Sequence, residues 1–267
     1  MPEISANGIN IQYDVQGNGT PLVLISGLGY PAWQWKRMLP HLSPHFQVIT
    51  FDNRGVGGTD KPAGPYTAGL LAADTAALMD ALGIPAAVVM GHSMGGFIAQ
   101  ELALSYPEKV SKLVLSSTNF GGPHHVPVTP EAMLVFADMT SDPITRFKNG
   151  LVVSTAPGFA ERHPEIIQEW LAWRLSNPLD PAGYQAQMAI GLALIPEAAS
   201  FEHKLANVSA PTLVLFGAHD KVVPPANADL LAGRIPNSKV VILAEAGHFF
   251  PMEVPAAASQ AVIDFAR

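Results

Sequence analysis

Short apolar runs alternate with longer amphipathic stretches along most of the chain. The apolar runs are rich in β-branched residues and are bounded by Gly, Pro and Asn, which is typical of buried strands. They occupy residues 21–25, 47–51, 86–90, 112–117, 211–216 and 239–243. Helical patterns separate them and are expected at 70–82, 95–105, 225–231 and from 256 onward, with helical turns within 31–42. This alternation predicts a parallel sheet built from βαβ units.

Two segments depart from this pattern. Residues 9–15 alternate between apolar and polar side chains, which predicts an antiparallel edge strand with one face in water. Residues 119–200 are helical and rich in proline, and a proline begins each of four expected helices, at 130–139, 143–153, 164–175 and 181–194. We interpret 119–200 as a helical cap inserted between two parts of an α/β core, residues 1–118 and 201–267.

Composition and charge exclude several classes of function. The 267 residues are 48% hydrophobic and only 14% charged, with a formal net charge of -7. This leaves no basic surface for phosphate backbones or anionic lipids, so we expect neither nucleic-acid nor membrane partners. The N-terminal residues turn polar at once, unlike a secretory signal, so we expect a cytoplasmic protein. We expect it to be a monomer or a homodimer. The lack of cysteine excludes disulfides, thiolate metal ligands and a cysteine nucleophile.

The clearest chemical signal is the sequence Gly-His-Ser-Met-Gly at 91–95. It lies between a predicted strand and a predicted helix, which is the context in which a Gly-x-Ser-x-Gly turn presents a nucleophilic serine. The chain would reverse so sharply that Ser93 is held in a strained conformation, and side chains at 91 and 95 would collide with the neighbouring strand and helix. The alternative is a glycine-rich turn in which Ser93 only caps the helix.

Five motifs follow the predicted strands in a fixed order. They are Ser-Gly-Leu-Gly at 26–29, Asp-Asn-Arg-Gly-Val-Gly at 52–57, Gly-His-Ser-Met-Gly-Gly at 91–96, Gly-Ala-His-Asp-Lys-Val-Val-Pro at 217–224 and Gly-His-Phe at 247–249. In this order they resemble the α/β-hydrolase family over essentially the whole chain. The resemblance implies a twisted, mostly parallel sheet of about eight strands, flanked by helices and carrying an inserted helical cap.

By this resemblance the catalytic residues are Ser93, Asp220 and His248, in the chain order of the family. A serine hydroxyl needs a base to remove its proton, and an acid must hold that histidine in the useful tautomer. Both Asp220 and His248 follow a predicted strand by a short loop. Glu245 is a second, less favoured candidate for the catalytic acid. Some relatives place this acid in the segment that corresponds to 116–119, which has no carboxylate here.

Two backbone N–H groups are expected to stabilise the negative charge of the tetrahedral intermediate. One would come from Met94, directly after the nucleophile, and the other, by resemblance, from Leu28 in the loop after the first buried strand. Many relatives have His-Gly at 26–27, where this chain has Ser26 and Gly27. Ser26 therefore replaces the side chain that supports this loop in many relatives. The backbone N–H of Leu28 is present whichever residue stands at 26.

Other polar residues in these motifs have a structural interpretation. His92 is expected to point into the packing between strand and helix, away from the nucleophile. Asp52 and Arg54 are expected to fix the geometry of their loop. His124 and His125 lack a paired ligand pattern, so we expect no metal site there.

The expected reaction is hydrolysis of a small, apolar carboxylic ester through an acyl-enzyme, without a cofactor. The candidate pocket residues are Phe120, Met133, Phe136, Trp170, Trp173 and Phe249. Packing of these side chains within the cap is the alternative. Similarity to enol-lactonases and their neighbours leaves lactone hydrolysis, C–C bond hydrolysis and cofactor-free perhydrolysis open. A small-ligand receptor that retains the three catalytic residues is a further possibility from a different class.

Overall fold

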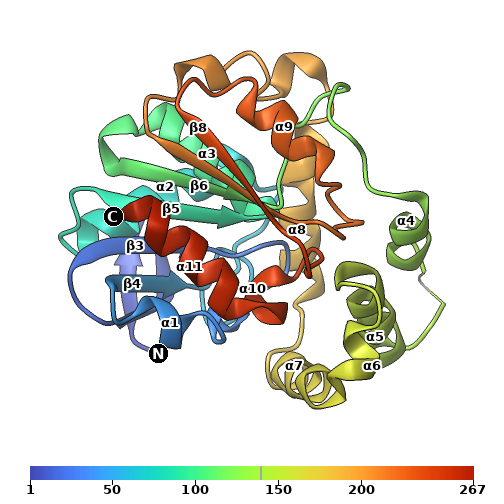
Figure 1. Cartoon of the computed structure of the whole chain (residues 1–267). Helices are drawn as coiled ribbons and strands as arrows, with labels where there is room; N and C mark the ends of the chain where they lie inside the picture. Colours follow the sequence, from blue (N-terminus) through green and yellow to red (C-terminus); the bar gives the residue numbers. More distant parts are fainter. Residues whose placement is uncertain (139) are drawn as a thin grey trace.

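The computed structural model describes residues 1–138 and 140–267 and is built around one eight-stranded sheet (Figure 1). The strands are β1 (Glu3–Ala6), β2 (Ile9–Gln16), β3 (Thr20–Ile25), β4 (Phe46–Phe51), β5 (Ala87–His92), β6 (Val110–Ser116), β7 (Thr212–Gly217) and β8 (Ser238–Leu243). Their order across the sheet is β1-β2-β4-β3-β5-β6-β7-β8. β2 pairs antiparallel with β1 and β4, and all other neighbours are parallel. The predicted, mostly parallel sheet is confirmed.

The antiparallel end of the sheet differs from the prediction. β2 is not an edge strand, because β1 pairs along its outer side with Ala6 opposite Ile9. The turn between the two strands is Asn7-Gly8, and both residues have positive φ angles, 48° and 74°, as a tight hairpin turn of this type requires. β1 has only four residues and no apolar run, so hydrophobic periodicity does not show it, although the Asn-Gly dipeptide is a hairpin signal.

Helices cover both faces of the sheet (Figure 1). α2 (Ala68–Ala81), α3 (Met94–Ser105) and α9 (Ala226–Ala232) pack on one face, and α1 (Leu39–Leu42) and α11 (Pro255–Ala266) pack on the other. Side chains of β3 alternate between the two cores: Val23 and Ile25 face α2 and α3, whereas Leu22 and Leu24 face α1 and α11. A strand buried on both sides gives the continuous apolar run seen in the sequence.

The segment 119–200, interpreted above as the cap, contains five α-helices among its described residues. They are α4 (Pro130–Phe136), α5 (Pro143–Ser154), α6 (Phe159–Arg162), α7 (Pro164–Ser176) and α8 (Pro181–Ala193). α4 to α7 lie together beside the core, and α8 returns to contact α3 (Figure 1). Side chains before the prolines cap three of these helices: Thr129 accepts an N–H bond from Ala132, Asp142 accepts bonds from Ile144 and Thr145, and Asp180 accepts one from Gly183.

The helix boundaries depart from the sequence prediction at a few places. The helix expected at 130–139 ends at Phe136, and Met139 lies outside the described residues. The single-turn helices α6 and α10 (Phe250–Glu253) were not predicted, because four residues are too few to show a helical period. In the described part of the chain, no helix combines the length and the apolar character that a membrane crossing needs.

Candidate active site

The turn between β5 and α3 holds Ser93 in a backbone conformation that residues with a side chain rarely adopt. Its φ and ψ angles are 55° and −119°. The Ser93 N–H donates to the Ser116 carbonyl at 2.9 Å, and Thr118 Oγ1 donates to the Ser93 carbonyl at 2.9 Å. These bonds to the end of β6 hold the strained turn in place. Ser93 therefore lies above the carboxyl end of the sheet, where it borders a cavity.

Glycine is required on both sides of this turn. A Cβ at Gly91 would lie 2.2 Å from the carbonyl oxygen of Gly95, and a Cβ at Gly95 would lie 2.2 Å from the carbonyl oxygen of Ile25. Neither position can accept a side chain without moving the backbone, so the close approach of β3, β5 and α3 depends on these glycines.

Asp220 and His248 form a buried, hydrogen-bonded pair at the ends of β7 and β8. His248 Nδ1 lies 2.9 Å from Asp220 Oδ2, and their side chains are 6% and 0% exposed. The other carboxylate oxygen of Asp220 accepts bonds from the N–H groups of Val222 and Val223, at 2.9 and 2.8 Å. A carboxylate oxygen accepts hydrogen bonds, so Nδ1 is the donor in this contact and Nε2 is the ring nitrogen left for another partner.

A buried glutamate that the sequence analysis did not single out fixes the histidine loop to the cap. Glu253 Oε1 accepts the Gly247 N–H at 3.0 Å, and its Oε2 accepts the Ala156 N–H at 2.7 Å. Burial, and after it the negative charge of Asp220, raise the pKa of this carboxyl to about 7 against the lowering effect of these bonds. The loop that carries His248 is therefore held by a group that titrates near neutral pH.

Two glutamine side chains hold the loop after β3 that contains Leu28. The Gly27 N–H donates to Gln34 Oε1 at 2.9 Å, and the Gly29 N–H donates to Gln187 Oε1 at 2.9 Å. Between these two tied amides, the Leu28 N–H meets no acceptor among the described residues. This arrangement leaves an oriented backbone donor beside the cavity that Ser93 borders.

The cap contributes directly to this loop. Gln187 comes from α8, is fully buried, and its Nε2 also donates to the Arg54 carbonyl at 2.8 Å. Arg174 from α7 donates to the Gly29 carbonyl at 2.9 Å, and its guanidinium lies 4.6 Å from the centre of the Tyr30 ring. Both backbone groups of Gly29 are thus bound by cap side chains.

Ser26, which stands where many relatives have histidine, is buried and supports the same loop. Its Oγ accepts the Trp35 indole N–H at 2.9 Å and donates to the Pro31 carbonyl at 3.4 Å. In the following loop, Asp52 accepts the Ala32 N–H at 2.7 Å through one of its carboxylate oxygens. These contacts bind the two loops to each other.

Arg54 forms a buried ion pair away from the cavity. Its Nε and one terminal nitrogen donate to the two carboxylate oxygens of Asp74 at 2.7 and 2.6 Å. Bidentate contact of this kind fixes the orientation of both side chains. The pair links the loop after β4 to α2, which agrees with the structural interpretation of Arg54.

His92 lies behind His248 in the site. Its Nδ1 is 2.8 Å from Ser116 Oγ, and the centres of the two imidazole rings are 4.9 Å apart. Burial lowers the pKa of His92 well below its ordinary value, and the neighbouring His248 lowers it further. His92 is therefore a neutral packing partner at neutral pH, so it adds no positive charge beside His248.

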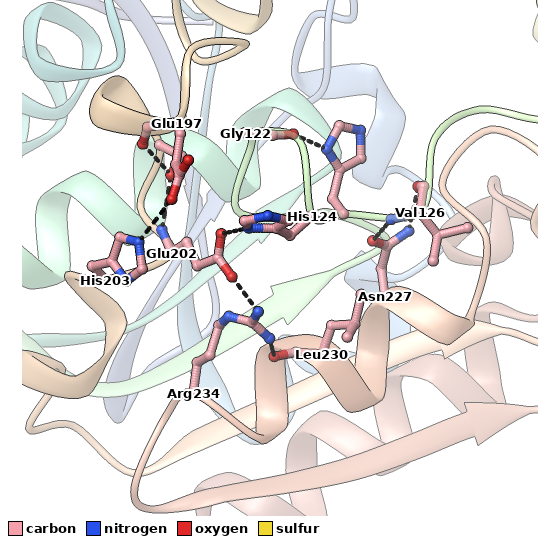
Figure 2. Close-up of polar contacts among 11 residues, drawn as sticks. Gly122, His124, Val126, Glu197, Glu202, His203, Asn227, Leu230 and Arg234 are labelled. Carbon is pink, nitrogen blue, oxygen red and sulfur yellow. Dashed lines mark hydrogen bonds and ion pairs between the residues drawn. The ribbon is translucent and has the colours of Figure 1, made fainter.

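The remaining two histidines considered above lie at the base of the cap. His124 Nδ1 contacts Glu202 Oε2 at 2.8 Å, and His125 Nδ1 donates to the Gly122 carbonyl at 2.6 Å (Figure 2). Within the ranges 1–138 and 140–267, no group of three or more His, Asp or Glu side chains is arranged to hold a metal ion.

The cavity beside Ser93, here called the inner cavity, has a volume of about 160 Å³. Its apolar lining comes from Leu28, Met94, Phe97, Met188 and Val223, and its polar lining from Ser93, Thr118, Asn119 and Gln187, with Gly191 completing the wall. The residues expected to supply the oxyanion donors, Leu28 and Met94, thus lie with Ser93 around one space.

None of the six candidate pocket residues lines the inner cavity, and their contact with a substrate stays a prediction. Met133 and Phe136 are about half exposed on α4. Phe120 is fully buried, with the Arg234 guanidinium 4.4 Å from its ring centre. Trp170, Trp173 and Phe249 belong to an aromatic cluster that joins the cap to the core. Phe120, Trp170 and Phe249 thus fill interior space, whereas α3 and α8 both contribute to the wall of the inner cavity.

Comparisons with known proteins agree with the fold. A family model described as alpha/beta hydrolase fold matches residues 20–255. A putative non-heme bromoperoxidase from Mycobacterium tuberculosis is 33% identical, with 96% of this chain and 97% of that protein covered. The 3-oxoadipate enol-lactonase 2 of Acinetobacter baylyi is 30% identical, with 97% and 94% covered. A solved thermophilic esterase from Thermogutta terrifontis has a TM-score of 0.83 at 30% identity, with 100% and 97% covered.

Proposed function

The chain belongs to the alpha/beta hydrolase fold family, and from this premise we propose that it is a serine hydrolase that cleaves a carboxylic ester of a small, apolar substrate through an acyl-enzyme on Ser93. The observation that carries the proposal is the combination of Ser93 on a strained turn at a cavity wall with the buried Asp220–His248 pair. Strain of this kind is retained at functional sites because surrounding contacts maintain it.

The reaction would begin with attack of Ser93 Oγ on the acyl carbonyl carbon. His248 Nε2 takes the hydroxyl proton, and Asp220 keeps the ring oriented through Nδ1. The N–H groups of Leu28 and Met94 bind the negative oxygen of the tetrahedral intermediate. Collapse of that intermediate breaks the bond to the alcohol oxygen, which receives the proton from His248.

The second half of the reaction restores the enzyme. A water molecule gives a proton to His248 and attacks the acyl carbon of the ester formed on Ser93. The carboxylic acid leaves when Ser93 Oγ recovers its proton from His248. Each residue thus returns to its starting state, and no redox partner is needed for the cycle.

An uncharged acyl group suits the inner cavity better than an ionised one. Of the described residues that line it, none is Lys, Arg, Asp or Glu. An ionised group bound there would lose its water without gaining an opposite charge, which is unfavourable. The lining instead offers apolar contact, with Asn119, Gln187 and Thr118 as polar exceptions.

Lactone hydrolysis is the second candidate, because the enol-lactonase relative is 30% identical across 97% of this chain. The same three residues would open a cyclic ester, and the alcohol would remain attached to the acyl group. A lactone of a dicarboxylic acid such as 3-oxoadipate keeps a free carboxylate, however, and the described lining of the inner cavity supplies no cation for it. An uncharged lactone fits the site better.

Hydrolysis of p-nitrophenyl acetate by the wild type and by Ser93→Ala tests the proposal. We expect many turnovers per wild-type chain and a loss of at least 10³-fold in kcat for the variant. Release of one equivalent that then stops would instead favour a receptor that retains the catalytic residues. Equal turnover by the two proteins would rule out Ser93 as the nucleophile.

A further inference from the structure

A second cavity, here called the outer cavity, adjoins the inner one. Its volume is about 240 Å³. Phe97, Asn119 and Gly191 line both cavities, so the two spaces meet between α3 and α8. Leu194, Ile195, Val128 and Val222 give the outer cavity a largely apolar wall. The outer cavity therefore extends the apolar space that begins at Ser93.

Gly191 stands at the junction of the two cavities. It lies inside α8, where glycine weakens a helix and any other common residue except proline would serve the helix better. A Cβ built at this position would meet no atom within 4 Å, leaving aside the glycine's chain neighbours and nearby helix backbone. Packing therefore does not require glycine here, and the lack of a side chain leaves the junction open.

The side of Ser93 on which the cavities lie indicates which half of the substrate they receive. His248 must protonate the leaving alcohol oxygen, so the alcohol lies towards His248. His248 is not among the described residues that line either cavity, whereas Leu28 and Met94 line the inner one. The cavities are therefore on the acyl side of the scissile bond.

Polar contacts hold the segment that contributes several residues to the wall of the outer cavity (Figure 2). Asn227 from α9 accepts the Val126 N–H at 2.9 Å and donates to the Val126 carbonyl at 2.8 Å. Glu202 binds both His124 and Arg234, and Arg234 holds the pKa of that carboxyl below its ordinary value. The segment that includes Gly121, Gly122 and His125 is thus anchored before any substrate binds.

We infer that the inner and outer cavities form one passage for a straight, uncharged acyl chain, and that Gly191 sets how long a chain can pass. This inference rests on the proposed function, because it assigns the acyl group that Ser93 receives. None of the described residues lining the outer cavity is Lys, Arg, Asp or Glu, and His125 is its one titratable side chain. A chain of methylene groups gains from burial there.

The test compares p-nitrophenyl acetate, butyrate and octanoate as substrates for the wild type and for Gly191→Leu. In the wild type we expect kcat/KM to rise with chain length by up to about fourfold per methylene, the factor expected for full burial. Leucine at 191 would occupy the junction, so the ratio of octanoate to acetate kcat/KM should fall at least about tenfold. Leucine is also a better helix former than glycine.

Two further variants keep the result interpretable. Val128 lines the outer cavity but not the inner one, so Val128→Trp reduces the space of the outer cavity and should lower the same ratio. Leu192→Phe adds bulk to an exposed neighbour, which is 58% exposed, and should leave the wild-type ratio unchanged. If the ratio of octanoate to acetate kcat/KM stays unchanged in both Gly191→Leu and Val128→Trp, the inferred passage is overturned but the proposed function is not. Failure of the wild type to hydrolyse any of the esters would overturn the proposed function and the passage with it.

Discussion

Glu253 is expected to make the stability of the protein decrease as pH rises. Its carboxyl is 7% exposed, and its pKa is raised to about 7, first by burial and then by the charge of Asp220. The folded protein therefore holds this proton more tightly than the unfolded chain, in which the pKa stays near its ordinary value. The stabilisation from this carboxyl is fully present at pH values below its pKa in the unfolded chain. It is lost as pH rises through about 7, its pKa in the folded protein.

The size of the effect follows from the two pKa values. A rise from 4.5 to about 7 corresponds to about 3 kcal/mol in the free energy of unfolding, of which about 2.5 kcal/mol falls between about pH 5 and about pH 8. Glu253→Gln keeps the side-chain length and one carbonyl acceptor but has no proton to lose. This contribution to the pH dependence should therefore disappear in the variant.

Denaturant unfolding at both pH values measures the effect. We expect the free energy of unfolding of the wild type to drop by about 2 to 3 kcal/mol more than that of Glu253→Gln between about pH 5 and about pH 8. Glu108→Gln, at an exposed carboxyl, serves as the matched control and should keep the wild-type slope. An equal pH dependence in wild type and Glu253→Gln would refute the assignment of this pKa to the buried carboxyl.

Three substitutions test other parts of the site. Gln187→Ala removes the acceptor for the Gly29 N–H. Because the neighbouring Leu28 N–H is then misplaced as an oxyanion donor, kcat should fall about 10- to 100-fold with little change in KM. A rise in KM at unchanged kcat would contradict this role. Asp220→Asn should lower kcat by about 10³- to 10⁴-fold, since it disturbs the histidine tautomer, and steady-state rates near wild type would count against it. Asp74→Ala leaves Arg54 buried without its partner and should lower the free energy of unfolding by about 3 to 5 kcal/mol in a denaturant titration; a loss under about 1 kcal/mol would contradict a buried pair.

Strands and the turn at Ser93 could be predicted because each depends on nearby residues. The parallel strands are buried on both faces and so appear as continuous apolar runs. The glycines at 91 and 95 stand in one short motif, although the Cβ that Gly95 avoids would meet Ile25 of the neighbouring β3. The hairpin before β2 was also predictable in principle from Asn7-Gly8, but strand periodicity alone does not reveal it.

The lining of the cavities depends on how distant helices dock, which periodicity does not specify. Gln187 holds an amide that lies 158 residues away in the chain, and nothing in its local sequence marks it. Trp170 was an attractive pocket residue, yet its ring stacks on Phe159 with centres 5.7 Å apart. Large aromatic side chains gain most by filling the interior, so small or flexible residues such as Gly191 and Met188 are left to border open space.

Covalent labelling tests the central claim, that Ser93 is the nucleophile, most directly. A fluorophosphonate reacts with a serine that a neighbouring histidine has activated. Intact-mass measurement after labelling should show one phosphonyl group per wild-type chain, peptide mapping should place it on Ser93, and Ser93→Ala should remain unlabelled. An unlabelled wild type, or an adduct on another residue that survives in Ser93→Ala, would contradict the account.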